Sequence, residues 1–366
     1  MTTSDLKTRI KQRIAAQGPI TIADYMATCL GDPQAGYYTT RQVFGRGGDF
    51  TTAPEVSQMF GELIGAFCLQ VWERMGSPKS FQLVELGPGR GTLMSDLLRT
   101  AALRPAFLEA AELTLVEISP KLRKQQAKKL ETSGLQPRFA ERLDQVESGP
   151  LILVANEFFD ALPIHQFIKT ASGWMERLVG LDDAGDLCFG IGTARLTDRD
   201  LPKSADTAPD GSILETQPAA NAVAEEVGAR IAKHGGCALF VDYGYLEAAP
   251  GDTLQALYKH SYDDVFARPG EADLTAHVNF GALAAAATRA GAVAFPPLEQ
   301  GEFLLRLGLL ERAGALGAGK SHLQQEGIRD AVERLAAPNQ MGQLFKVLAL
   351  SNTPAQLSPF DEPSGR

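Results

Sequence analysis

A glycine-rich turn between an apolar run and a helical pattern is the sequence feature best suited to chemistry. Gly87, Gly89 and Gly91 lie in the string VELGPGRGTL at 84–93. Glycines at this spacing let the chain turn tightly and bring backbone N–H groups close to a ligand. A threonine stands where the third glycine of the dinucleotide pattern G-x-G-x-x-G would fall, and Glu85 disfavours a pyrophosphate. The motif therefore predicts a ligand whose ammonium group is held by Glu85, whereas a turn that only packs a helix on a strand is the alternative.

A second acid, Glu117, ends the next apolar run along the chain. A carboxylate at the tip of the second strand commonly accepts hydrogen bonds from both hydroxyls of a ribose. The alternative is a solvated acid in front of the very polar helical stretch PKLRKQQAKKL. Together with Glu85 and the glycine turn, Glu117 is predicted to bind ribose.

These motifs resemble those of the class I S-adenosylmethionine-dependent methyltransferases, with an acid-x-G-x-G-x-G turn and a ribose-binding acid after the second strand. Three further strings narrow the resemblance: GDFTTAPE at 48–55, ANEFFDALP at 155–163 and ADLTAHVNF at 272–280. They resemble the mitochondrial dysfunction protein A family, whose mitochondrial member methylates an arginine in a subunit of respiratory complex I during assembly. The resemblance implies S-adenosyl-L-methionine as cofactor and a protein arginine as methyl acceptor. Asn279 departs from the family pattern, in which Asp is expected.

The NEFFD string fits this chemistry. Methyl transfer from a sulfonium is an in-line displacement, so alignment and electrostatics supply most of the acceleration. A guanidinium has a pKa above 12 and only N–H donors, so carboxylates must fix and polarise it. Glu157 and Asp160 are predicted to form such a clamp, and Asn156 to cap the turn or contact the methionine part of the cofactor. In the alternative, Asn156 and Asp160 only cap a helix.

Two more residues complete the candidate site. Asp242 ends a further apolar run before the sequence YGY, and the two tyrosines either line a groove for a cation or pack in the core. His277 could accept a proton after transfer, or be a hydrogen-bonded structural residue. The candidate catalytic residues are Glu157, Asp160, Asp242 and His277, and the candidate cofactor-binding residues are Glu85, Gly87, Gly89, Gly91, Glu117 and Asn156.

These residues require a sheet that brings strand ends together. From about residue 80, helical patterns alternate with apolar runs: FQLVEL at 81–86, LTLVEI at 113–118, LILVAN at 151–156 and CALFVD at 237–242. Such runs are typical of buried parallel strands joined by crossover helices. They predict an α/β fold with a doubly wound, mostly parallel sheet of the class I methyltransferase type. Ligands of such sheets bind beyond the carboxyl ends of the strands.

The domain organisation follows from the flanking segments. We predict an N-terminal helical or lid region at 1–78, a methyltransferase domain at 79–350 and a flexible tail at 351–366. Insertions are expected at about 170–230, with a hairpin, and at 243–280, as a long connection. Thr52 to Glu55 predict a capping box at a helix start. The glycine-rich, aromatic segment 31–55 predicts a lid, with an ordered loop as the alternative.

Composition limits the partners and the location. The 366 residues carry a net charge of −9, which argues against binding of nucleic acid or an anionic membrane. The four scattered cysteines predict neither a disulfide framework nor a metal site. No window approaches the roughly 18 apolar residues of a membrane helix. The amphipathic start is predicted to be a first helix, faintly similar to a mitochondrial presequence, and the expected location is the cytoplasm of a bacterium or the matrix of a mitochondrion.

Other functions stay open on the sequence alone. A non-catalytic cofactor-binding assembly factor would keep Glu85, Gly87 and Glu117 as well. A methyltransferase could also act on a small molecule. A dinucleotide oxidoreductase is disfavoured by the missing third glycine and by Glu85. No sequence feature bears on the oligomeric state.

Overall fold

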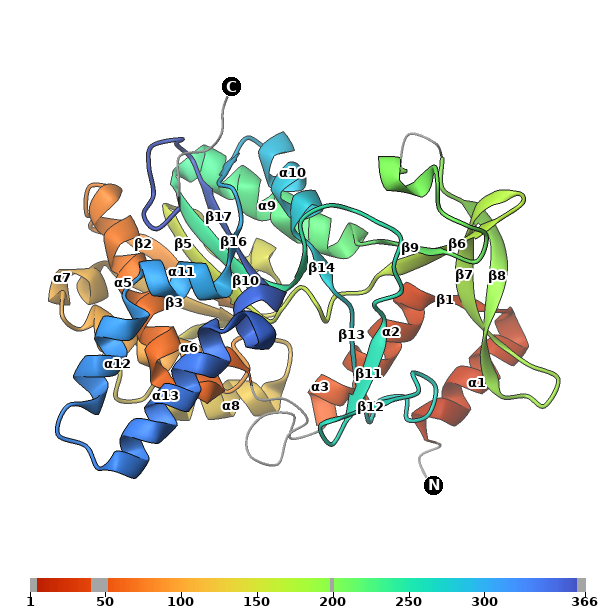
Figure 1. Ribbon diagram of the computed structural model, residues 1–366, viewed down its shortest axis with the longest axis horizontal. Coiled ribbons are helices and arrows are strands. Elements are labelled where there is room, and N and C mark those ends of the chain that lie inside the picture. The colour runs from red at the N-terminus through yellow and green to blue at the C-terminus, as the bar shows by residue number, and fades with distance from the viewer. Residues whose placement is uncertain (1–4, 41–51, 198–200, 361–366) are drawn as a thin grey trace. The chain divides into compact units, whose positions relative to one another are not determined.

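A computed structural model of the protein describes residues 5–40, 52–197 and 201–360, as Figure 1 shows. The chain divides into two compact units, each assembled from three segments of the sequence. Unit 1 contains Met1–Phe50, Asp160–Asn221 and Glu247–Asn279, and unit 2 contains Thr51–Phe159, Ala222–Leu246 and Phe280–Arg366. The chain therefore passes between the units several times, and the domain boundaries at 78/79 and 350/351 remain predictions.

Unit 2 is built on a large, mostly parallel sheet with the strand order β15-β17-β10-β5-β2-β3-β4. Neighbouring strands from β10 to β4 are parallel, whereas β17 pairs antiparallel with β10, β15 and β16. This confirms the predicted sheet. The strands are β2 (Phe81–Leu86), β3 (Ala111–Val116), β4 (Arg138–Ala140), β5 (Leu151–Asn156), β10 (Gly236–Tyr245), β15 (Val293–Ala294), β16 (Leu298–Glu299) and β17 (Phe345–Ser351).

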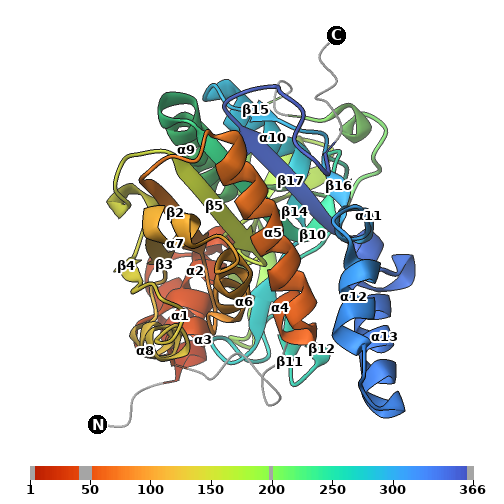
Figure 2. The same cartoon turned by 90° about the vertical axis from the view of Figure 1, so that its left-hand side faces the viewer.

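Helices cover this sheet and bury both of its faces. On β5, Ile152 and Val154 join the core formed with the helix α5, which Figure 2 shows across the sheet, and the intervening Leu153 is buried on the other side. Residues of a parallel sheet are apolar on both faces because helices cover both. The helices are α4 (Ala53–Val56), α5 (Gln58–Arg74), α6 (Thr92–Ala101), α7 (Pro105–Ala110), α8 (Pro120–Lys129), α9 (Pro218–His234), α10 (Phe280–Arg289), α11 (Gln300–Arg306), α12 (Leu309–Gly317) and α13 (His322–Ala336).

The predicted capping box is wrong. Thr52 is the N-cap of α4, but its side chain makes no capping hydrogen bond. The helix that begins after Thr52 ends before Ser57, whose extended backbone separates α4 from α5. The hydroxyl of Ser57 caps α5 by accepting from the N–H of Met59. The Glu55 side chain is taken by other partners, described below.

The predicted flexible tail is also wrong for residues 351–360. Phe360 is buried against Phe67, Phe295 and Phe303 in the core of unit 2. Burial of a phenylalanine side chain contributes about 1.5–3 kcal/mol, enough to hold a short segment in place. Residues 361–366 lie outside the described residues.

Among its described residues, unit 1 contains two small sheets and three α-helices. One sheet has the order β1-β7-β6-β9 with β8 beside β7, and the other has the order β12-β11-β13. The predicted hairpin is β7–β8, and the predicted long connection contains the second sheet. The elements are α1 (Leu6–Gln17), β1 (Ile20–Thr21), α2 (Ile22–Gly31), α3 (Tyr37–Thr40), β6 (His165–Thr170), β7 (Gly173–Leu181), β8 (Leu187–Arg195), β9 (Ile213–Thr216), β11 (Gln255–Tyr258), β12 (Ser261–Asp263), β13 (Asp273–Thr275) and β14 (Val278–Asn279).

The first helix is amphipathic, as predicted. Leu6, Ile10 and Ile14 of α1 are buried in the core of unit 1, beside Tyr25 and Tyr37. Within the described residues, no helix is both long enough and apolar enough to cross a bilayer.

Candidate active site

The glycine turn joins β2 to α6. Gly87, Gly89 and Gly91 have φ angles of +60°, +51° and +75°, a region that residues with a side chain rarely adopt. A Cβ atom at Gly87 would lie 2.9 Å from the ring of Phe158. Gly91 is the N-cap of α6 and makes no side-chain capping hydrogen bond. The first N–H groups of a helix can bind polar atoms of a ligand.

Glu85 lies in β2, two residues before this turn. Its side chain is 2% exposed, and its Oε2 atom has no hydrogen-bond partner among the described residues. Burial, together with the nearby charge of Glu117, raises the pKa of Glu85 to about 8. A buried carboxylate of this kind is stable when protonated or when a cation lies beside it.

Glu117 follows β3 directly and is also buried. Its Oε1 atom accepts a hydrogen bond from the N–H of Ser119 at 2.8 Å, and its Oε2 atom accepts one from Nε2 of Gln126 at 3.2 Å. Burial raises the pKa of Glu117, and these two donors oppose that rise. Because β2 and β3 are parallel neighbours, the structure brings Glu85 and Glu117 together at one edge of the sheet, as predicted from the sequence.

The turn after β5 carries Asn156 and Glu157. Glu157 has a φ of +50°, an unusual value for a residue with a side chain. Its Oε1 atom accepts hydrogen bonds from the N–H of Ala53 at 3.0 Å and from Nδ2 of Asn156 at 3.1 Å. The buried Oδ1 atom of Asn156 has no hydrogen-bond partner among the described residues. The turn thus holds one carboxylate in a fixed orientation at the carboxyl end of the sheet.

Asp242 in β10 is fully buried and has a different environment. Its Oδ2 atom accepts hydrogen bonds from the N–H groups of Phe158 and Phe159, at 3.1 and 2.9 Å, and its Oδ1 atom accepts from Tyr243. Its carboxylate therefore holds the turn after β5, so we expect it to position this turn and not to touch an acceptor. Tyr243 packs edge-on against Phe345, which favours the packing alternative for this tyrosine.

Glu55 connects the two turns and was missed as a functional residue. Its Oε1 atom accepts a hydrogen bond from Oγ1 of Thr92 at 2.5 Å, and its Oε2 atom lies 3.4 Å from Nη1 of Arg90. The short helix α4 is therefore bonded to the glycine turn by Glu55 and to Glu157 by the N–H of Ala53. The GDFTTAPE string was the available signal, but its role could not be read without the fold.

Asp160 and His277 belong to unit 1. The backbone oxygen of Asp160 accepts a hydrogen bond from the N–H of Ala276 at 3.0 Å. The side chain of Gln217 donates to the backbone oxygen of His277 and accepts from the N–H of Asn279. Burial lowers the pKa of His277. The ADLTAHVNF string is thus close to Asp160 within unit 1, whereas all other predicted site residues lie in unit 2.

The middle of the predicted lid, residues 41–51, falls outside the described residues. The part before it is packed: Tyr37 is buried, and Oη of Tyr38 donates to Oδ1 of Asp273 at 2.9 Å. The packing of these two tyrosines favours the ordered-loop alternative for the first part of the segment. The lid itself remains a prediction.

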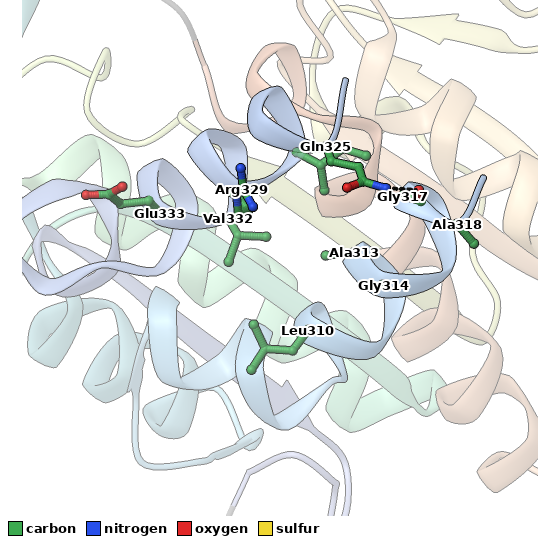
Figure 3. A pocket seen from close by; sticks show the side chains of 10 residues that line it. Leu310, Ala313, Gly314, Gly317, Ala318, Gln325, Arg329, Val332 and Glu333 are labelled. Carbon is green, nitrogen blue, oxygen red and sulfur yellow. Dashed lines mark hydrogen bonds between the residues drawn. The ribbon is translucent and has the colours of Figure 1, made fainter. Parts of the chain in front are cut away.

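Unit 2 also contains a cavity of about 540 Å³ between α12 and α13 (Figure 3). Small and apolar residues such as Leu310, Gly314 and Val332 line it, and Nε2 of Gln325 donates across the two helices to the backbone oxygen of Gly317. None of the predicted site residues contributes to its lining. We therefore treat it as separate from the carboxyl edge of the sheet.

Comparison with known proteins shows which family the chain belongs to. Residues 63–298 match a protein family described as S-adenosyl-L-methionine-dependent methyltransferases. The chain belongs to this methyltransferase family. It is 38% identical over 377 residues to the protein arginine methyltransferase NDUFAF7 homolog, mitochondrial, of Drosophila melanogaster, with 94% of this chain and 84% of the relative covered. The human protein arginine methyltransferase NDUFAF7, mitochondrial, is 36% identical, with 92% of this chain and 81% of the relative covered.

A solved structure supports the same assignment. A Burkholderia thailandensis protein crystallised with S-adenosyl-homocysteine is 31% identical to this methyltransferase and superposes with a TM-score of 0.82. The match covers 94% of this chain and 91% of that chain. The predicted fold class, methyltransferase activity and S-adenosyl-L-methionine cofactor are thereby confirmed.

The residues of the methyltransferase fit this cofactor. The buried Oε2 of Glu85 and Oδ1 of Asn156 have no hydrogen-bond partner among the described residues, so both have acceptor capacity left for a ligand. At Gly87, Gly89 and Gly91, no side chain blocks a close approach of the ligand to the backbone. A cofactor with an ammonium group, a sulfonium and two ribose hydroxyls supplies the charge and donors that such acceptors need.

Proposed function

We propose that this methyltransferase acts on an arginine side chain of a protein. The observation that carries the proposal is its similarity, over 94% and 92% of the chain, to relatives named protein arginine methyltransferases. An arginine acceptor also suits a site rich in carboxylates, because a guanidinium has five N–H donors and no acceptor.

In this proposal, Glu157 holds the acceptor guanidinium. The N–H of Ala53 and the amide of Asn156 both bind its Oε1 atom. A carboxylate oriented in this way can bind the planar edge of the guanidinium and polarise the nitrogen that receives the methyl group. Asp160, three residues later in the chain, is a second candidate for this role, and His277 is a candidate for accepting the proton.

The cofactor-binding residues have separate roles in the proposal. Glu85 pairs with the ammonium group of the methionine part, and Glu117 accepts from the ribose hydroxyls. The backbone of Gly87, Gly89 and Gly91 borders the ligand without side chains in the way. Bound S-adenosyl-L-methionine supplies a methyl group on a positively charged sulfur, and the chain has to align that methyl group with the acceptor nitrogen.

The target and the compartment are part of the same proposal. The resemblance to the mitochondrial dysfunction protein A family indicates a subunit of respiratory complex I as the target. The relatives from Drosophila melanogaster and human are named mitochondrial proteins. We therefore propose the mitochondrial matrix for a eukaryotic source and the cytoplasm for a bacterial one.

Mass spectrometry with a labelled cofactor tests the acceptor. A proteome from cells lacking this protein is incubated with the purified enzyme and S-adenosyl-L-methionine that carries a deuterated methyl group. We expect deuterated methyl groups on arginine of a respiratory complex I subunit. Label on small molecules alone would contradict a protein acceptor, and S-adenosylhomocysteine binding without any transfer would favour the assembly-factor alternative.

A variant of Glu157 tests the clamp. Glu157→Gln keeps the size of the side chain and removes its charge, so transfer should fall at least about a hundredfold while S-adenosylhomocysteine affinity stays within about twofold. The exposed Glu109 of α7 offers a matched control, since Glu109→Gln should change neither quantity. A parallel loss of affinity and transfer would assign Glu157 to the cofactor site or to the fold.

A further inference from the structure

Gln126 is a polar residue at an apolar position of α8. Leu122, Gln126 and Leu130 follow one another at four-residue spacing and are all buried, Gln126 completely. Positions at this spacing form one face of a helix, and the face that packs on a core is normally apolar. A fully buried glutamine in such a face is expected to have hydrogen-bond partners, because burying an amide without them destabilises the folded protein.

The amide nitrogen of Gln126 has two such partners. Nε2 of Gln126 donates to the backbone oxygen of Gly89 at 2.7 Å and to Oε2 of Glu117 at 3.2 Å. An amide nitrogen carries two N–H groups, and here each has an acceptor. One side chain therefore links the glycine turn to the carboxylate after the next strand, which are separate in the sequence.

The other end of the amide lowers the contribution of this residue to stability. The buried Oε1 of Gln126 has no hydrogen-bond partner among the described residues. Such an oxygen destabilises a folded protein. A leucine at this position would continue the apolar face and remove the unpaired oxygen. The unpaired oxygen of the glutamine therefore lowers the stability of the fold, and the two hydrogen bonds that the amide nitrogen donates must offset this loss.

We propose that Gln126 is a positioning residue for the nucleoside part of S-adenosyl-L-methionine. It holds the Glu117 carboxylate in the orientation that receives the ribose hydroxyls, and it keeps that carboxylate in register with the glycine turn. This inference rests on the proposed ribose role of Glu117.

Calorimetry with S-adenosylhomocysteine tests the inference without knowledge of the methyl acceptor. Gln126→Leu should weaken binding about ten- to a hundredfold, the range expected for a lost hydrogen bond to a charged group. Its thermal unfolding without ligand should be unchanged or slightly higher. Gln125→Leu on the same helix is the matched control and should keep the affinity. Unchanged affinity in Gln126→Leu would overturn the inference.

A double-mutant cycle separates positioning from general structural support. In a Glu117→Gln background, Gln126→Leu should change the affinity by no more than about twofold, because the carboxylate that it orients is gone. An analogue of S-adenosylhomocysteine that lacks the 2′ and 3′ hydroxyls of the ribose should likewise bind to the wild type and to Gln126→Leu with about equal affinity. Full additivity of the two substitutions, or an equal loss for both ligands, would overturn the inference.

Two further outcomes keep the conclusion clear. If Gln126→Leu does not fold, Gln126→Glu has nearly the same shape but places an acceptor against two acceptors, and it should lose affinity in the same way. If Glu117→Gln itself leaves S-adenosylhomocysteine affinity unchanged, both the ribose role of Glu117 and this inference fail. If Glu117→Gln weakens binding and Gln126 variants do not, only the inference fails.

Discussion

The carboxylates at two neighbouring parts of the sheet differ in what already binds them. At the ends of β2 and β3, Glu85 has one oxygen without a hydrogen-bond partner among the described residues, and Glu117 has two donors. In β10, Asp242 is bound by three backbone N–H groups. All three acids are buried near the carboxyl end of a strand.

The difference separates ligand-binding acids from fold-building ones. A buried acid whose oxygens are bound by the backbone of its own chain stabilises that backbone. A buried acid with acceptor capacity left is unfavourable in the free protein and gains when a cationic ligand arrives. We therefore expect substitutions of Asp242 to reduce stability first, and substitutions of Glu85 and Glu117 to reduce cofactor binding first.

The largest effect is expected at the glycine turn beside Glu85. Gly89→Val should abolish detectable binding of S-adenosylhomocysteine in calorimetry, because a branched side chain at a φ of +51° both strains the turn and fills the ligand space. Gly185→Val, at a φ of +79° in the β7–β8 hairpin with open space around it, is the control for backbone strain and should keep binding. Retained binding in Gly89→Val would place the cofactor elsewhere.

Asp242→Asn tests the fold-building side of the comparison. The amide nitrogen cannot accept a hydrogen bond, so at least one of the three backbone N–H groups of Phe158, Phe159 and Tyr243 loses its partner, and we expect a loss of about 2–4 kcal/mol in the free energy of unfolding. Urea unfolding of the unliganded protein measures it. A stable variant with reduced methyl transfer would instead return Asp242 to the catalytic residues predicted from the sequence.

Glu117→Ala tests the ligand-binding side. We expect S-adenosylhomocysteine binding to weaken by about 1–3 kcal/mol, the scale of hydrogen bonds to a charged group. The free energy of unfolding without ligand should change less than it does in Asp242→Asn. A larger loss of stability in Glu117→Ala than in Asp242→Asn would contradict the distinction between ligand-binding and fold-building acids.

The smallest effect is expected for Glu85, in the way that the free energy of unfolding depends on pH. Its pKa is raised from 4.5 in the unfolded chain to about 8 in the fold, so the folded state binds the extra proton between these values. The stabilising contribution of this proton is complete below the unfolded pKa and is lost as the pH rises through the folded pKa. Between about pH 6 and 8, unliganded wild type should lose about 1 kcal/mol per pH unit relative to Glu85→Gln in urea unfolding. Parallel pH profiles would mean that Glu85 is already ionised.

Much of the fold could be predicted because its signals are local. FQLVEL and LILVAN coincide with β2 and β5, and the spacing of Leu6, Ile10 and Ile14 identifies α1. The glycine turn was recognisable because only glycine adopts its φ angles at low cost. By contrast, the capping box at Glu55 and the flexible tail were wrong, because distant partners, Thr92 and the aromatic core around Phe360, took these residues.

For the site, the sequence alone determined which residues stand at strand ends and that the turn after β2 must approach a ligand. Only the tertiary structure decided what each of these residues binds. Glu55, Gln126 and Asp242 each have a hydrogen-bond partner in a segment that is far away in the sequence. Periodicity and turn chemistry depend on neighbouring residues, whereas the hydrogen bonds of a buried polar group depend on which strand ends and helices the fold places around it.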